Sequence, residues 1–239
     1  MASGTSARRA GPCAPDCGGD LHLPGHMTRY DISVSYGPET PPWPGDTPYS
    51  CGWAWEMADG ASVNVGRVTT SWHVGTHADA PLHVLAGGAP SESLPLDVFS
   101  GPALVVDARD ASAGATLTVD WLEHALDGRR LPARLLVRTG CSVRSGNFPE
   151  SWPCLTAESA AWLVRGGLRL LGVDAPSVDA RSATELTVHH TLFDGGAFVL
   201  ENLHLSAVPA DAYHLTAYPV LVTGADAAPV RAVLETLQG

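Results

Sequence analysis

Three short apolar runs, separated by two helical segments, limit the folds available to this chain. The runs span residues 103–107, 134–139 and 168–174, and each has the length and the Leu/Val content of a strand buried on both faces. The helical segments lie between them, at 118–126 and 156–167. This alternation of buried strands and helices predicts a mixed α/β domain.

Both helical segments carry start signals, and the second also carries a stop signal. Thr118 and Thr156 can each accept a hydrogen bond from the first turn as an N-cap residue, and Asp120 and Glu158 place a carboxylate in that turn. A glycine pair that begins at Gly166 ends the second segment. We therefore expect two helices that begin at these threonines.

Further strands are predicted on both sides of this central region. Residues 30–35, 62–70 and 213–223 each have the pattern of a strand. The prolines between residues 41 and 48 force a loop between the first two of these strands. The domain is therefore expected to contain more strand than helix.

Size and charge exclude several classes of protein. The 239 residues suit one domain with its own core, and no apolar run approaches the roughly 18 residues that cross a membrane. The 25 acidic residues outnumber the 14 basic ones, and such a surface repels the phosphates of nucleic acids. We expect a protein that binds a small molecule, and neither nucleic acid nor a membrane.

The domain is predicted to span residues 29–239 and to follow a disordered tail, residues 1–28, that is rich in Gly, Pro, Ser and Ala. Met27 is a candidate for the biological start. The tail contains four potential zinc ligands that are too closely spaced for a small zinc finger: Cys13, Cys17, His22 and His26. The odd number of cysteines and the lack of a secretory signal favour the cytoplasm.

Four side chains that can bind a metal or move a proton lie close together in the segment His73-Val-Gly-Thr-His77-Ala-Asp79-Ala-Pro-Leu-His83. Its glycine and proline argue against a helix and favour an extended or looping path. On such a path His77 and Asp79 point the same way, and Gly75 lets the chain bend so that His73 joins them. Two imidazoles and a carboxylate suit zinc or manganese.

Candidates for proton transfer and for further metal binding lie beyond this set. His83 follows the proline, so it can lie near the metal without binding it, and an imidazole suits general acid–base catalysis. A second cluster downstream contains His189, His190, Asp194 and Glu201. Glu201 stands in an apolar run, where an unpaired carboxylate is costly unless it binds a cation.

These residues resemble a known family. The segment 73–83 is similar to the signature of the cyclase-type metal-dependent hydrolases, which include the kynurenine formamidases and the isatin hydrolases. Further stretches resemble the formamidase branch in particular: the Trp-Pro-Gly-Asp-Thr-Pro loop at 43–48, Val63-Asn-Val, Gly172-Val-Asp-Ala-Pro-Ser-Val-Asp179, the His189-His190 pair and Pro229-Val-Arg-Ala-Val. The resemblance covers the chain from about Asp31 to Leu237.

The resemblance implies a swivelling β/β/α fold, a homodimer and two divalent metal ions per subunit, with zinc as the first choice and manganese as the second. It implies five metal ligands: His73, His77, Asp79, His189 and Glu201. Asp79 and Glu201 would each bridge the two ions. His83 would be the proton donor and acceptor, and Trp43 would pack against the aryl ring of the substrate.

The reaction that the resemblance implies is hydrolysis of N-formyl-L-kynurenine to L-kynurenine and formate. Alternatives are hydrolysis of another aryl or cyclic amide such as isatin, a biosynthetic cyclase or lyase with the same metal centre, and metal binding without catalysis. The Trp-Pro-Gly-Asp-Thr-Pro loop favours the formamidase over the first two, and the complete ligand set counts against the third. Residues 191–196 depart from the formamidase form and add a carboxylate, Asp194, near the predicted site.

Overall fold

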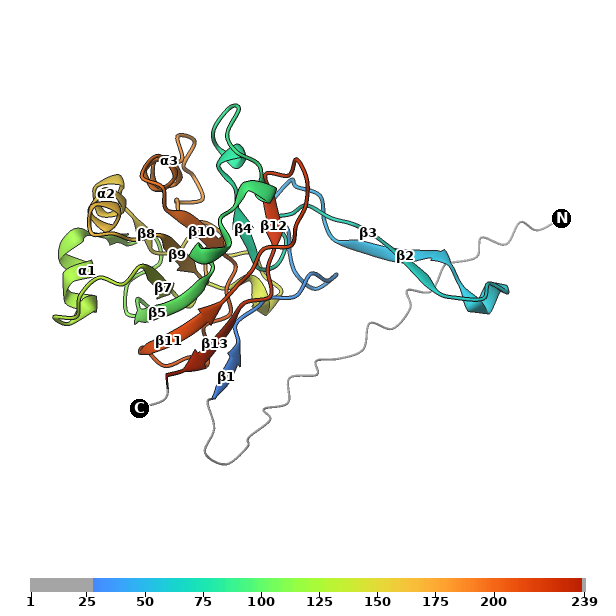
Figure 1. The fold of residues 1–239 in the computed structure, drawn as a ribbon, viewed down its shortest axis with the longest axis horizontal. Coiled ribbons are helices and arrows are strands. Elements are labelled where there is room, and N and C mark those ends of the chain that lie inside the picture. The colour runs from blue at the N-terminus through green and yellow to red at the C-terminus, as the bar shows by residue number, and fades with distance from the viewer. Residues whose placement is uncertain (1–27, 238–239) are drawn as a thin grey trace.

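The computed structural model describes residues 28–237, and its centre is a nine-stranded mixed sheet (Figure 1). In spatial order the strands are β1 (Arg29–Asp31), β13 (Val233–Thr236), β11 (Ala212–Thr216), β5 (Ser100–Asp107), β7 (Arg134–Arg138), β9 (Leu170–Val173), β10 (Phe198–Glu201), β4 (His77–Asp79) and β12 (Ala227–Pro229). The predicted mixed α/β class is confirmed. The predicted tail lies outside the described residues except for Thr28, as do its potential zinc ligands and the proposed start at Met27.

The three apolar runs form the parallel centre of the sheet. Strands β5, β7, β9 and β10 pair in parallel, and the strands outside them pair antiparallel. Parallel neighbours need crossover connections, which here contain α1 (Val119–Leu126), α2 (Ala157–Arg165) and α3 (Thr187–Asp194). The three helices lie together over one face of the sheet (Figure 1). A strand in this position is covered on both faces, which is why its sequence is almost wholly apolar.

Both predicted helices begin where their capping threonines indicate, and the second ends where its glycine pair indicates. The hydroxyl of Thr118 accepts a hydrogen bond from the backbone N–H of Trp121 at 3.3 Å, and that of Thr156 accepts one from Ser159 at 2.9 Å. Helix α2 ends at Arg165, directly before Gly166. Local sequence signals therefore determined both helices.

The third helix, α3, was not predicted, and its N-terminus explains why. No side chain caps it locally, and Leu186 before it has a left-handed backbone with φ of 46°. The carboxylate of Asp179 instead accepts the backbone N–H groups of Val188 and His189, both at 3.0 Å. A cap supplied from outside the helix leaves no local start signal.

Apolar side chains cover both faces of the sheet and form two buried cores. The core on the helix side contains residues of α1, α2 and α3 together with Leu135, Leu171 and Val199. The core on the opposite face contains Phe99, Leu136 and Leu200. Because successive strand residues point to opposite faces, neighbours in one apolar run, such as Leu135 and Leu136, contribute to different cores.

Three of the predicted strands are longer than the strands in the structure, and the predictions are wrong at these ends. The strand predicted at 62–70 is observed only over Val65–Thr69. The strand predicted at 213–223 stops at Thr216, and only an isolated bridge joins Pro219 to Val230 further along. Proline has no N–H to donate to a ladder, so it disfavours continuation of the strand. The strand predicted at 30–35 continues beyond Asp31 only as a single bridge at Ser33.

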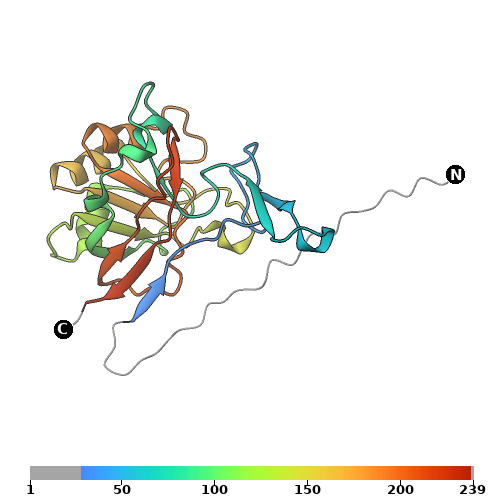
Figure 2. The same ribbon diagram turned by 45° about the vertical axis from the view of Figure 1, so that its right-hand side comes forward.

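A hairpin projects from the body as a separate arm (Figures 1 and 2). It consists of β2 (Ser50–Trp55) and β3 (Val65–Thr69), which pair antiparallel, and every residue of both strands is exposed. A further pair, β6 (Thr116–Leu117) and β8 (Cys154–Leu155), runs parallel beside the helices. Among the described residues, no helix has the length and hydropathy that a membrane span requires.

Candidate metal centre

The register between β4 and β10 places three candidate ligands on one face of the sheet. His77 stands directly opposite Glu201, and Asp79 lies two residues further along β4. Residues that are paired across strands or two apart along a strand share a face. As a result, Nε2 of His77 lies 3.2 Å from Oδ1 of Asp79 and 3.6 Å from Oε2 of Glu201.

A bend before β4 brings His73 to the same point, as the sequence predicted. Gly75 has φ of +72°, and an added Cβ there would lie 2.7 Å from the ring of Tyr36, so only glycine fits. After this bend, Nδ1 of His73 lies 3.1 Å from Nε2 of His77 and 3.2 Å from Oδ1 of Asp79. The three donor atoms of the upstream segment therefore converge.

Helix α3 supplies the third imidazole, His189, from the opposite side of Asp79. Nε2 of His189 lies 3.3 Å from Oδ2 of Asp79 and 3.3 Å from Oε1 of Glu201. Asp79 thus presents one oxygen to His73 and His77 and the other oxygen to His189. Two overlapping groups of donors result, with Asp79 common to both.

Each of these three imidazoles is oriented through its other ring nitrogen. Nδ1 of His77 lies 3.0 Å from the carbonyl oxygen of Gly75, and Nδ1 of His189 lies 2.7 Å from the Asp179 carboxylate. Nε2 of His73 lies 3.0 Å from Oδ2 of Asp226. An imidazole that donates one N–H in this way directs the lone pair of its second nitrogen into the cluster, the arrangement found around metal ions in proteins.

The donor set fits a divalent cation. Oδ1 of Asp79 is fully buried and accepts no hydrogen bond within the described structure, although two imidazole nitrogens lie 3.2 Å away. Metal–nitrogen distances of 2.0–2.1 Å place the donors of a tetrahedral site roughly 3.3 Å apart. The donor separations here, from 3.1 to 3.6 Å, are of that size.

Electrostatics of the cluster also favour a cation. Burial opposes a charge on His77, but the carboxylates of Asp79 and Glu201 outweigh it and raise its pKa to about 10. Burial likewise opposes a charge on His73, and the nearby carboxylates of Asp226 and Asp79 outweigh it and raise its pKa to about 9. The carboxylates therefore stabilise positive charge at this buried point, which a metal ion supplies.

His83 lies at the edge of the cluster, in the short 3-10 turn Pro81–His83. Its ring centroid is 4.2 Å from that of His73, and its side chain is 29% exposed, more than those of the other cluster imidazoles. Burial lowers its pKa, which favours the neutral ring. A donor atom of His83 also lies within 4.8 Å of donors on His73 and Asp79, so the geometry permits this imidazole to bind a metal as well.

Trp43 belongs to an aromatic group near the site. Its ring packs edge-on against Phe148 and Trp152, with centroid distances of 5.2 and 6.0 Å. The indole N–H of Trp152 donates to the backbone carbonyl of Asp179 at 3.0 Å, so the group connects to the residue that orients His189. Trp43 is half-buried and anchors its proline-rich loop.

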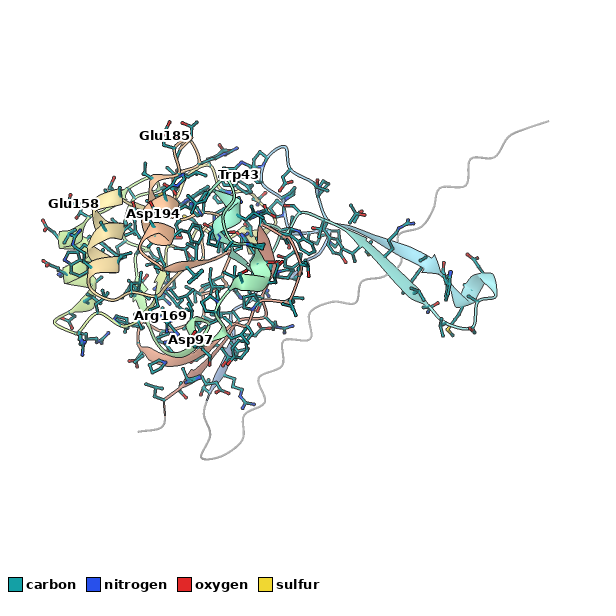
Figure 3. All side chains as sticks on the ribbon, turned by 45° about the horizontal axis from the view of Figure 1, so that its top comes forward. Trp43, Asp97, Glu158, Arg169, Glu185 and Asp194 are labelled. Atoms are coloured by element: carbon teal, nitrogen blue, oxygen red, sulfur yellow. The ribbon has the colours of Figure 1, made fainter. Side chains whose placement is uncertain are left out.

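Asp194 does not join the cluster. It is exposed at the C-terminal end of α3 (Figure 3). His189 on the same helix is buried. Five residues along a helix correspond to a rotation of about 140°, which turns the two side chains to different sides. His190 is half-buried on the same helix. The expectation of a spare carboxylate near the metal is therefore corrected.

Two carboxylates of the site, those of Asp179 and Asp226, were missed as functional residues. Asp179 ends a stretch that carried the family resemblance, so a signal for it was present. Asp226 follows Gly224 and Ala225 in a small-residue segment without a local cue. Its role depends on its closeness in space to His73, although the two residues are 153 positions apart in the sequence.

Known proteins are similar to this chain in sequence and in fold. Residues 30–180 match the Cyclase family model. The kynurenine formamidase of Bordetella avium (strain 197N) is 39% identical over 87% of this chain and 98% of its own length. The kynurenine formamidase of Bacillus mycoides (strain KBAB4) is 40% identical over 87% of this chain and 97% of its own length.

Solved structures of related proteins have the same fold as this chain. A predicted metal-dependent hydrolase from Bacillus stearothermophilus superposes with a TM-score of 0.74 at 27% identity, covering 88% of this chain and 99% of that one. Isatin hydrolase A from Ralstonia solanacearum shares the fold with a TM-score of 0.75 at 24% identity, covering 88% and 92%. The chain therefore belongs to the Cyclase family of metal-dependent hydrolases, together with the kynurenine formamidases.

Proposed function

We propose that this protein is a metal-dependent arylformamidase that hydrolyses N-formyl-L-kynurenine to L-kynurenine and formate. The observation that carries the chemistry is the convergence of His73, His77 and His189 on the two oxygens of Asp79. The substrate follows from the two kynurenine formamidases, which match this chain over 87% of its length at 39% and 40% identity.

Two divalent cations suit the charge of the site better than one. Four carboxylates surround it, those of Asp79, Glu201, Asp179 and Asp226. Imidazoles are neutral when they bind a metal, so two divalent ions balance the four negative charges. We propose that His73, His77 and Asp79 hold one ion, and that His189, Glu201 and Asp79 hold the other. Zinc matches this mixed nitrogen and oxygen donor set, as does manganese.

The bound cations supply acidified water and a polarised formyl carbonyl. The reaction forms a C–O bond between water and the formyl carbon and breaks the C–N bond to the aryl amine. His83 is placed to accept the proton of the attacking water, because burial lowers its pKa and its ring lies beside the cluster. It then returns that proton to the departing amine nitrogen. An aryl amine leaves readily, so one imidazole suffices for both transfers.

We propose that Trp43 contacts the aryl ring of the substrate. Its edge-on packing against Phe148 and Trp152 holds the indole in place, and the half-buried ring keeps surface available for stacking. The contact between Trp152 and Asp179 links this aromatic group to the ligand side of the site. Substrate orientation would then depend on the same residues that orient His189.

The proposal predicts chelator-sensitive turnover of N-formyl-L-kynurenine. An absorbance assay that follows L-kynurenine release, on protein of measured metal content, is expected to show activity that falls to background with a chelator and returns with zinc or manganese. Isatin is the comparison substrate, because the fold is shared with isatin hydrolase A. Two bound metals without turnover of N-formyl-L-kynurenine would contradict the substrate, and preference for isatin would support a cyclic amide instead.

We propose that the protein is a homodimer assembled through the arm. A two-stranded hairpin is marginally stable alone in water, yet every residue of β2 and β3 is exposed in the single chain. The exposed side chains are largely apolar: Trp53, Trp55, Met57, Val63, Val65 and Val68. An exposed patch of this kind marks an interface, and aromatic residues and Met are enriched at such surfaces.

Replacing Trp53 and Trp55 together with Ser is expected to dissociate the dimer. Truncation of one central aromatic at an interface costs about 2 kcal/mol or more, so the loss of both tryptophans should raise the dimer dissociation constant at least about 10²-fold. Size-exclusion chromatography with light scattering over a dilution series measures this shift. Leu96→Ser, at an exposed position on the body, is the matched control and should leave the mass unchanged. A dimer that persists in the double variant, or a monomeric parent protein, would contradict the arm's role.

We also propose a cytoplasmic location and no nucleic-acid or membrane partner. All three cysteines in the described part of the chain, Cys51, Cys141 and Cys154, are free, which supports a reducing compartment. The excess of 25 acidic over 14 basic residues supports the lack of a nucleic-acid partner.

A further inference from the structure

Asp226 is held firmly at the edge of the candidate metal centre. It directly precedes β12, where Ala227 is paired with Asp79 of β4. Its own carbonyl accepts the backbone N–H of Ala80 at 2.9 Å, and the carbonyl of Ala225 accepts that of Ser91 at 2.9 Å. Strand pairing with the ligand-bearing segment therefore determines where the Asp226 carboxylate lies.

One oxygen of this carboxylate faces two imidazoles. Oδ2 of Asp226 is 3.0 Å from Nε2 of His73 and 3.6 Å from Nδ1 of His83. The rings of His73 and His83 lie against each other, with centroids 4.2 Å apart and planes inclined by 38°. The carboxylate thus lies where a proposed metal ligand meets the proposed proton carrier.

The His73 ring needs a hydrogen-bond partner that fixes its orientation more than the rings of His77 and His189 do. His77 lies in a strand and His189 in a helix, whereas His73 precedes the bend at Gly75 and is outside both kinds of element. The His73 side chain is also 18% exposed, against 1% for His77 and 2% for His189. Without a partner on Nε2, this ring can rotate or place its proton on Nδ1, the atom that faces Asp79.

We propose that Asp226 is a positioning residue for this metal centre. It accepts the Nε2–H of His73, keeps the lone pair of Nδ1 directed at the metal position, and holds His83 against the His73 ring. This inference rests on the proposed metal-dependent function. It assigns a task to a residue outside the proposed ligand set.

The test compares Asp226→Ala and Asp226→Asn with the parent protein. Zinc and manganese dissociation constants are measured by competition with a chelating indicator, without substrate. Asp226→Ala should bind either metal about 10–100-fold more weakly, as found when the outer partner of a metal-bound histidine is removed. Asp226→Asn keeps an acceptor oxygen and should return the affinity to within about 5-fold of the parent, since a neutral acceptor retains most of the hydrogen bond.

Two further measurements separate positioning from a general structural effect. Asp194→Ala removes an exposed carboxylate from α3 and should bind metal as the parent does. Thermal unfolding of the metal-free proteins should show both Asp226 variants folded. In metal-saturated protein, Asp226→Ala should lower kcat and leave KM nearly unchanged, because the carboxylate acts on His83 and not on substrate binding.

Unchanged metal affinity in Asp226→Ala would overturn the inference, and so would an Asp226→Asn variant as weak as the Ala variant. A parent protein that binds neither metal would overturn it together with the proposed metal centre. A parent protein that binds metal without hydrolysing N-formyl-L-kynurenine would contradict only the proposed substrate, because the affinity comparison needs no turnover.

Discussion

Replacing His83 with Ala is expected to lower the turnover of N-formyl-L-kynurenine by about 10²–10⁴-fold, the usual contribution of a general acid–base group. The reason is positional. The ring of His83 lies beside the donor cluster, burial lowers its pKa, and it is the most solvent-accessible of the cluster imidazoles, with 29% of its side chain exposed. The amine would then leave without a proton donor.

The metal content of the His83→Ala protein distinguishes a role in proton transfer from a role as a metal ligand. The His83→Ala protein should keep the metal stoichiometry of the parent, measured by elemental analysis after dialysis. His124→Ala, an exposed histidine on α1, is the matched control and should leave turnover intact. Loss of a metal ion in His83→Ala would make this residue a ligand, which its distance from His73 and Asp79 permits. Full turnover would remove it from the mechanism.

Replacing Asp79 with Ala is expected to abolish metal binding and activity together. Both of its oxygens face imidazole donors, so its removal takes a ligand from both proposed metal positions at once. Metal ions supply several kcal/mol of transition-state stabilisation, so turnover should fall by more than about 10³-fold. The Asp79→Ala substitution also leaves His77, which is fully buried, without its nearest carboxylate.

Thermal unfolding with and without added zinc or manganese provides an independent check. Because a ligand stabilises only the folded state that binds it, the parent protein should gain Tm with metal, and Asp79→Ala should not. Asp97→Ala removes an exposed carboxylate that pairs with Arg169 and serves as the control (Figure 3). An Asp79→Ala protein that retained two metal ions at full occupancy would contradict the bridging role.

Several features of this protein follow from local sequence. The Leu- and Val-rich runs became β5, β7 and β9 because a strand covered on both faces must be apolar throughout. Thr118 and Thr156 began α1 and α2 because an N-cap interaction spans only three residues. Period-two alternation brought His77 and Asp79 to one side, and the Gly75 bend returned His73 to them.

Other features depend on contacts that no local pattern encodes. Helix α3 begins where the Asp179 carboxylate meets two backbone N–H groups, and this carboxylate also orients His189. His189 itself meets Asp79 across 110 residues of sequence. The pairing of β10 with β4 and of β4 with β12 determines which residues share a face, and pairing partners are chosen by the whole sheet.

The sequence by itself therefore determined the chemical identity of the donors, the helices α1 and α2, the central strands β5, β7 and β9, and the family. Tertiary structure alone decided that Asp226 reaches His73 and His83, that Asp194 turns to solvent, and that the Asp179 carboxylate both begins α3 and orients His189. The physical reason is the distance along the sequence over which each kind of interaction acts. Caps, turns and side-chain alternation act over a few residues, whereas the geometry of a metal centre is set by strand register and helix packing between distant segments.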